Sequence, residues 1–115
     1  MKINREHIKN TFQEYTDRYD STDPKIKLKI DHTYRVADLC ERIAKSLDLL
    51  QEDIDLAWLS GMLHDIGRFE QLRRYHTFSD AQSIDHAKFA VELLYEDRLI
   101  ADYVPEISTV KSVSN

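Results

Sequence analysis

The sequence predicts an all-α fold, a helical bundle of about five to six helices. Of its 115 residues, 42% are hydrophobic and 32% are charged, and only two glycines and two prolines interrupt the chain. Apolar residues recur every three or four positions over most of the length, which is the period of an amphipathic helix. A many-stranded fold needs more turn residues than this chain has. The length fits a single domain spanning residues 1–115.

The N-terminal part of the sequence predicts two amphipathic helices. The first covers residues 4–20, where the apolar stripe consists of Ile8, Phe12, Tyr15 and Tyr19. A polar break follows, and Pro24 suits the first turn of a second helix over about 25–48. The apolar stripe of this second helix consists of Val36, Leu39, Cys40, Ile43, Ala44 and Leu47.

A third helix is predicted to begin near Gln51 and to be apolar on almost every side. A helix of that kind is buried, so we expect it at the centre of the bundle. Gly67 follows the apolar run and is expected to end the helix as a left-handed C-cap. The polar segment 68–77 then predicts either a short helix or a structured loop.

The remainder of the chain predicts one further clear helix and a weaker tail. Ser79 or Asp80 is expected to cap a helix that runs to about Asp97. The tail, 99–115, has a weak helical pattern with a break at Pro105.

Charge and composition exclude several classes of function. Sixteen basic and 21 acidic residues give a net charge of −5, the wrong sign for an extended nucleic-acid surface that neutralises phosphates. The single cysteine, Cys40, has no intramolecular partner for a disulfide. The chain shows neither an apolar run as long as a membrane span nor a signal peptide. We therefore expect a cytoplasmic protein without a membrane partner.

The five histidines differ in the direction that helical geometry gives them. His7 shares its face with charged residues and is expected in solvent, whereas His76 lies between helices, where periodicity gives no direction. His32 and His86 both fall on inward-facing arcs of their helices. An inward histidine is either a core residue bonded to a backbone carbonyl or a ligand, and geometry leaves both alternatives open.

The pair His64 and Asp65 closes the most hydrophobic helix of the chain. Burying two polar side chains is costly unless something compensates them. Asp65 is expected in the last helical turn, where the helix dipole disfavours a carboxylate and a bound cation would reverse the penalty. The alternative is that the helix end reaches water and the pair is simply solvated.

Two stretches resemble the motifs of a known family. Residues 61–68 (GMLHDIGR) resemble the motif that names the HD superfamily of metal-dependent phosphohydrolases, and residues 31–37 (DHTYRVA) resemble its first-histidine motif. The resemblance implies an HD-domain-like helical bundle with a metal-binding core over 25–95, in which His32, His64 and Asp65 bind one divalent ion. Segment 83–87 (SIDHA) resembles the position at which two-metal members supply another histidine. This implies that His86 is a further metal ligand, with a packed core histidine as the alternative.

One part of the family pattern has no counterpart in the sequence. The pattern closes with an aspartate on a later helix, and neither Asp97 nor Asp102 lies in a stretch that resembles it. We therefore expect that the chain ends before its closing ligand. From this follow three further expectations: weak metal binding, poor phosphohydrolase activity, and homo-oligomer formation through apolar surface that later helices would cover.

The resemblance also implies a chemistry, the hydrolysis of a phosphate ester or anhydride, with a phosphorylated small molecule or nucleotide as partner. Imidazole and carboxylate ligands suit Mn, Fe, Co, Ni or Zn better than Mg, which prefers oxygen ligands. Arg35 and Arg68 follow the proposed ligands by about one helical turn and are expected to hold the substrate phosphate. No catalytic residue is assigned, because Glu70 is the only nearby general acid and its direction cannot be read from the sequence.

Two alternative functions remain open at this stage. If catalysis requires the closing aspartate, the chain is a non-catalytic metal- or nucleotide-binding regulatory domain. It is a two-iron, oxygenase-like HD protein if His86 completes a second metal site. Fold alone does not decide among the three.

Overall fold

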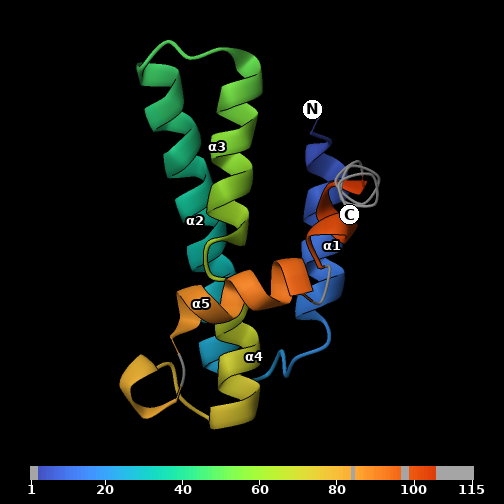
Figure 1. Cartoon of the computed structure of the whole chain (residues 1–115), viewed down its shortest axis with the longest axis vertical. Coiled ribbons are helices and arrows are strands. Elements are labelled where there is room, and N and C mark those ends of the chain that lie inside the picture. The colour runs from blue at the N-terminus through green and yellow to red at the C-terminus, as the bar shows by residue number, and fades with distance from the viewer. Residues whose placement is uncertain (1–2, 84, 97–98, 106–115) are drawn as a thin grey trace.

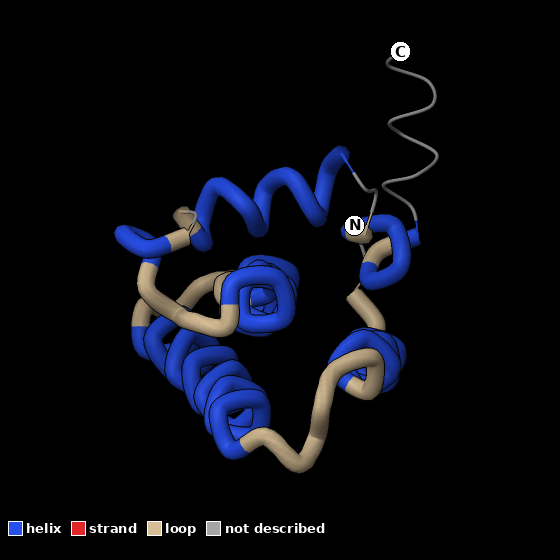
Figure 2. The backbone as a smooth tube through the Cα atoms, turned by 90° about the horizontal axis from the view of Figure 1, so that it is seen from below, coloured by secondary structure: helices blue, strands red, loops and turns tan. Residues whose placement is uncertain are grey.

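The computed structural model describes residues 3–83, 85–96 and 99–105 of the chain, and within these ranges every regular element is a helix (Figures 1 and 2). The elements in chain order are α1 (Arg5–Thr16), α2 (Pro24–Ser46), α3 (Gln51–Leu63), α4 (Ile66–Tyr75), η1 (Asp80–Gln82), α5 (His86–Val91), η2 (Glu92–Glu96) and α6 (Ile100–Tyr103). The prediction of an all-α bundle of about five to six helices is confirmed.

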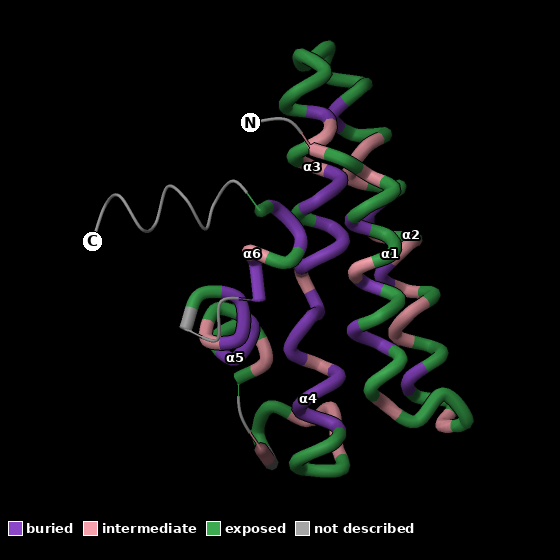
Figure 3. Tube along the Cα trace, turned by 90° about the vertical axis from the view of Figure 1, so that its right-hand side faces the viewer, coloured by how far each residue is buried: buried purple, intermediate pink, exposed green. Residues whose placement is uncertain are grey.

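Helices α2 and α3 form a long antiparallel hairpin, and α4 continues the line of α3 beyond a short break (Figure 1). Helix α5 crosses α4, while α1 and α6 lie together on the other side of the molecule. Buried residues run down α3 and α4 and onto α5, so these segments form the centre of the bundle (Figure 3). None of the described helices is both long and apolar enough to cross a membrane.

The α2–α3 hairpin depends on a close approach of the two backbones at Gly61. A Cβ atom added at Gly61 would lie 2.5 Å from the Cα of Ala37, which is itself fully buried. Real Cβ atoms do not approach other atoms so closely, so only glycine fits here. Gly61 lies one helical turn before His64. Its close contact with Ala37 therefore fixes how near His64 lies to α2.

The predicted limits of the first two helices are partly correct. α1 ends at Thr16 rather than near residue 20, because the amides of Arg18 and Tyr19 reach back only three residues, to the carbonyls of Tyr15 and Thr16. Such bonds tighten the last turn and end an α-helix. α2 begins at Pro24, as predicted.

Gly67 does not cap the third helix, and that prediction is wrong. α3 already ends at Leu63, and Gly67 is the second residue of α4 with a negative φ. Its small size serves packing instead, because a Cβ there would lie 2.9 Å from the carbonyl oxygen of His86 and 3.0 Å from the amide nitrogen of Ala90. The residue that ends α4 in the left-handed conformation is His76, with φ 58°.

Segment 68–77 is largely helical, in agreement with the first of its two predicted alternatives. The next helix starts later than predicted, because Asp85 rather than Ser79 or Asp80 accepts the capping bonds, at 3.0 Å from the amide of Ala87. α5 then continues as the π-helical segment η2. In the tail, the short helix α6 precedes Pro105, and the rest of the predicted tail, 106–115, lies outside the described residues.

Candidate metal centre

Asp65 lies at the junction of α3 and α4 and is only 5% exposed. It occupies the N-cap position of α4, but its side chain makes no capping bond there. The prediction that it lies in the last turn of the preceding helix is therefore wrong, since α3 ends two residues earlier. The dipole of α4 favours the carboxylate in this position. Because the side chain does not bond to the backbone amides of α4, it can contact side chains of other segments.

Three imidazoles converge on this carboxylate from three segments of the chain. The Nε2 atoms of His64 and His32 lie 3.2 and 3.5 Å from Asp65 Oδ2, and Nε2 of His86 lies 3.6 Å from Oδ1. The ligand atoms of His32, His64 and Asp65 all lie within 4.8 Å of one another. Nitrogen and oxygen donors this close together are spaced as the ligands of one metal ion would be.

The orientation of the His64 ring supports a cation at this place. Its Nδ1 lies 2.6 Å from the carbonyl oxygen of Gly61, and because a carbonyl only accepts, Nδ1 must donate its proton. In the neutral ring Nε2 then carries a lone pair that faces the carboxylate of Asp65. Either a second proton or a metal ion relieves this repulsion, so the residues present fit a bound metal.

Lys29 is a member of the cluster that the sequence analysis missed. Its ammonium lies 3.1 Å from Asp65 Oδ2, and its side chain is 19% exposed. Helical spacing is the signal that would have found it, because Lys29 lies three residues before His32 on the same face of α2. It supplies a positive charge to Asp65 when no metal is bound.

The pKa shifts in the cluster follow from these contacts. Burial opposes the ionisation of Asp65, but the contacts with His64 and Lys29 outweigh it and hold its pKa far below the ordinary range. The bond to Asp65 raises the pKa of His64 against the effect of burial. Burial and the charge of Lys29 lower the pKa of His32. The site thus holds a carboxylate of lowered pKa beside one imidazole whose pKa is raised and one whose pKa is lowered.

The match to known families agrees with this geometry. A model of the HD domain matches residues 30–111, which include the four predicted ligands His32, His64, Asp65 and His86. The chain belongs to the HD-domain family. This membership places it in a superfamily of metal-dependent phosphohydrolases, whose domains bind divalent metals. A search of curated proteins and a search of solved structures gave no match.

Of the two arginines predicted to hold substrate in this HD domain, only Arg35 is exposed. It lies one turn beyond His32, and its charge contributes to the lowered pKa of that imidazole after the larger effects of burial and Lys29. Arg68 is largely buried, and its Nη1 donates to Gln71 Oε1, to the carbonyl oxygen of Phe78 and to Asp80 Oδ1. Arg68 therefore ties the segment after α4 to α4 itself.

Glu70, the nearby acid noted from the sequence, does not join the HD cluster. Its buried carboxylate accepts from the guanidinium groups of Arg73 and Arg74 and from the hydroxyl of Tyr19. Both arginines are exposed at the surface, and each is ion-paired with Glu70. His7 and His76 are exposed, and neither is among the groups around Asp65.

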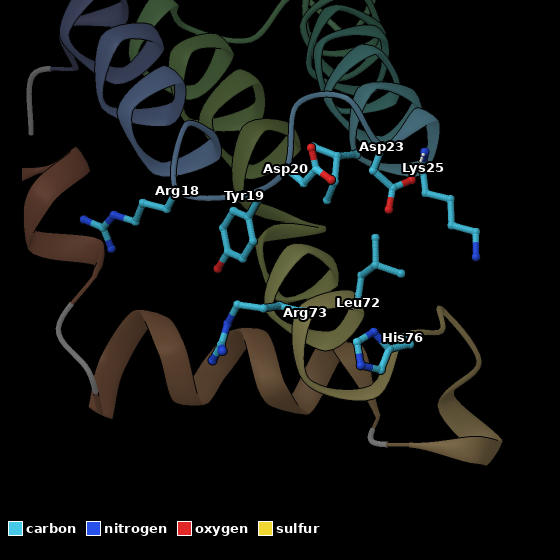
Figure 4. Close-up of a pocket in the computed structure, with 9 residues that line it drawn as sticks. Arg18, Tyr19, Asp20, Asp23, Lys25, Leu72, Arg73 and His76 are labelled. Atoms are coloured by element: carbon cyan, nitrogen blue, oxygen red, sulfur yellow. Dashed lines mark hydrogen bonds between the residues drawn. The ribbon is translucent and has the colours of Figure 1, made fainter.

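A cavity of about 430 Å³ opens elsewhere on the HD domain, between the α1–α2 connection, the first turn of α2 and the end of α4 (Figure 4). Its lining consists of Arg18, Tyr19, Asp20, Asp23, Lys25, Ile26, Leu72, Arg73 and His76. This lining carries both signs of charge and includes none of the four predicted ligands. This cavity is therefore separate from the candidate metal centre around Asp65.

Proposed function

We propose that this HD domain is a metal-dependent phosphohydrolase that cleaves a phosphate ester or anhydride, with nucleotides among its substrates. The observation that supports the proposal is the convergence of three imidazole Nε2 atoms, at 3.2, 3.5 and 3.6 Å, on one buried carboxylate. A buried charge of this kind needs compensation, and metal coordination provides it. The family match gives the chemical class of the reaction.

The proposed ligands are His32, His64, Asp65 and His86. Three nitrogen donors and one carboxylate suit Mn, Fe, Co, Ni or Zn better than Mg, which prefers oxygen ligands. When bound, such a metal supplies an activated water of lowered pKa and stabilises the charge that develops on the phosphoryl oxygens. The protein's own contribution is to hold the four donors in place and to present cations to the substrate.

Lys29 and Arg35 are the proposed phosphate-binding residues. Lys29 is already in contact with Asp65, and a metal that takes over this carboxylate would free the ammonium for a substrate oxygen. Arg35 is exposed on the same helix, one turn beyond His32. Arg68, the other predicted substrate residue, uses only Nη1 for its three bonds to acceptors of the chain. Its Nε makes no hydrogen bond and lies 4.0 Å from Asp65 Oδ1, beside the proposed metal.

The test is hydrolysis of nucleoside mono- and triphosphates and a generic phosphodiester in the presence of Mn, Co, Ni, Mg or Zn. In keeping with the poor activity expected from the sequence, we expect slow turnover with a transition metal, lost in Asp65→Asn and His64→Ala and retained in Glu70→Gln. The last variant is a matched control, because Glu70 is as buried as Asp65 but is paired with arginines. Metal binding by wild-type protein without turnover of any substrate would contradict the proposed function.

A further inference from the structure

Beyond the four proposed ligands, one carboxylate controls the orientation of a ligand histidine. Asp80 Oδ2 lies 2.8 Å from His86 Nδ1, on the side of the ring opposite to Asp65. A carboxylate only accepts, so His86 Nδ1 donates and Nε2 is left to face Asp65 at 3.6 Å. The ring thus bridges the two carboxylates with opposite ends.

Asp80 is itself fixed by two donors from α4. Its Oδ1 accepts from Arg68 Nη1 at 2.9 Å and from Gln71 Nε2 at 3.0 Å. Gln71 is fully buried and also donates to Ser83 Oγ at 2.9 Å, which ties both ends of η1 to α4. These bonds give the two oxygens of Asp80 separate partners, because Oδ1 faces α4 and Oδ2 faces His86.

From this geometry we infer that Asp80 is a positioning residue of the metal centre, which fixes His86 in the tautomer protonated at Nδ1 and so keeps Nε2 available as a metal ligand. Groups that hold the second nitrogen of a ligand histidine typically change metal affinity by about 10- to 100-fold. The predicted effect on metal affinity rests on the proposed function, because it requires that a metal binds at this site. The hydrogen bond to His86 is testable without metal.

Asp80→Asn is the decisive variant because it keeps the shape of the side chain and reverses the direction of its hydrogen bond with His86 Nδ1. The donors Arg68 and Gln71 hold the amide oxygen at the place of Oδ1, so the amide nitrogen faces His86 Nδ1. Nδ1 must then accept, which moves the ring proton to Nε2 and blocks the lone pair that faces Asp65. A change from Asp to Asn beside a functional histidine is known to select the wrong tautomer in this way.

The first measurement is the ¹⁵N spectrum of histidine-labelled, metal-free protein at a pH where the imidazoles are neutral, with the His86 signals identified by their loss in His86→Gln. We expect His86 to be protonated at Nδ1 in wild type and in Asp85→Asn, and at Nε2 in Asp80→Asn. Asp85 is the matched control, since it caps α5 next to His86 and asparagine caps equally well. The wild-type spectrum decides the inference even if Asp80→Asn fails to fold.

The second measurement is Mn²⁺ or Co²⁺ affinity by calorimetry. We expect a loss of about 10- to 100-fold in Asp80→Asn, recovery in Asp80→Glu, and no change in Asp85→Asn. A wild-type His86 protonated at Nε2, or a loss of affinity with an unchanged tautomer, would overturn the positioning role; the latter would make Asp80 a ligand itself. If wild type binds no metal, the proposed function fails, and the spectrum still decides whether Asp80 sets the tautomer.

Discussion

Two buried carboxylates five residues apart, Asp65 and Glu70, have opposite surroundings. Asp65 is 5% exposed and is surrounded by three imidazoles and one lysine, with the guanidinium Nε of Arg68 farther away at 4.0 Å. Glu70 is 8% exposed and accepts hydrogen bonds from two guanidinium groups and a tyrosine hydroxyl. In both, the pKa lies below its ordinary value: the bond to Arg73 has the largest effect at Glu70, and at Asp65 His64 and Lys29 outweigh burial. Burial and charge alone therefore do not distinguish them.

The difference lies in what the partners are able to do. Guanidinium groups stay protonated in proteins and offer no lone pair, so the ion pairs of Glu70 are a closed structural unit. Imidazoles lose a proton near neutral pH and then coordinate metals, so the surroundings of Asp65 are open to exchange a proton for an ion. A buried carboxylate indicates a metal site only when its neighbours are themselves ligands.

The largest expected effect is on metal binding, in a pair of matched variants. Asp65→Asn should weaken Mn²⁺ or Co²⁺ binding by about 100-fold or more, since an amide replaces the only anionic ligand. Glu70→Gln should leave the affinity within about twofold of wild type, because its partners are not ligands. Calorimetry on both proteins checks this, with circular dichroism to confirm that each is folded. Equal losses in the two variants would remove the distinction between the carboxylates.

The second prediction concerns pH. Because the pKa of His64 is raised above 6.5, a metal must displace its proton, and affinity should rise about tenfold per pH unit for that proton until the pKa is passed. The stabilisation of the folded protein by Mn²⁺, measured as a shift in Tm, should therefore be larger at pH 8 than at pH 6. A shift independent of pH would contradict the role of His64 as a ligand.

The metal-free protein should show the opposite trend. The raised pKa of His64 contributes stability that is complete below 6.5 and is lost as pH rises through the folded value. The lowered pKa of Asp65 contributes stability that is present above 3.8 and is lost as pH falls further. From these two groups, Tm without metal should be highest between about pH 4 and 6.5. The lowered pKa of His32 acts in the opposite direction, because it costs stability as pH falls below 6.5. Thermal scans from pH 3 to 8 on wild type and His64→Ala therefore isolate the His64 contribution, and the variant should lose less stability than wild type as pH rises above 6.5.

A third, smaller effect is expected on folding at Glu70. Glu70→Gln removes the charge that pairs with Arg73 and Arg74 while it preserves the shape, and it should lower the free energy of unfolding by about 1 kcal/mol. Urea unfolding measures this, with Glu14→Gln as a control on the exposed face of α1. A variant as stable as wild type would show that this ion-pair cluster does not support α4.

The smallest expected effect is an increase in metal affinity. Lys29→Met removes the ammonium that neutralises Asp65 in the metal-free site, and metal affinity should rise by several-fold because no cation competes for the carboxylate. Lys25→Met, one turn earlier and at the surface of α2, should change nothing. If Lys29→Met instead weakens metal binding, then Lys29 supports the centre rather than competing with the ion.

Local signals in the sequence sufficed for the parts of the fold that depend on neighbours along the chain. The start of α2 was predictable because Pro24 at the first turn is a local feature. Gly67 was misassigned because its reason is a crossing by α5, about twenty residues later, which no local pattern contains. The end of the third helix was missed for a related cause, since apolar residues continue across the break at His64 and Asp65.

The residues of the candidate site also differ in whether the sequence indicates them. Residue spacing and the family resemblance indicated His32, His64, Asp65 and His86, and helical geometry would also have indicated Lys29, which shares a face with His32. The role of Asp80 beside His86 could not be predicted from the sequence, because the segment between α4 and α5 has no periodicity that gives a direction to its side chains. Its role follows only from the bonds that connect it to α4 and His86.

Anomalous diffraction from crystals of the wild-type protein soaked with Co²⁺ or Mn²⁺ tests the central claim most directly. We predict a strong peak about 2.0–2.2 Å from a carboxylate oxygen of Asp65 and from Nε2 of at least two of His32, His64 and His86. Lys29 should have left its contact with Asp65 in the same crystals. A metal bound only by the exposed carboxylates of Asp80 and Asp85, or only in the cavity near Tyr19 and His76, would contradict it.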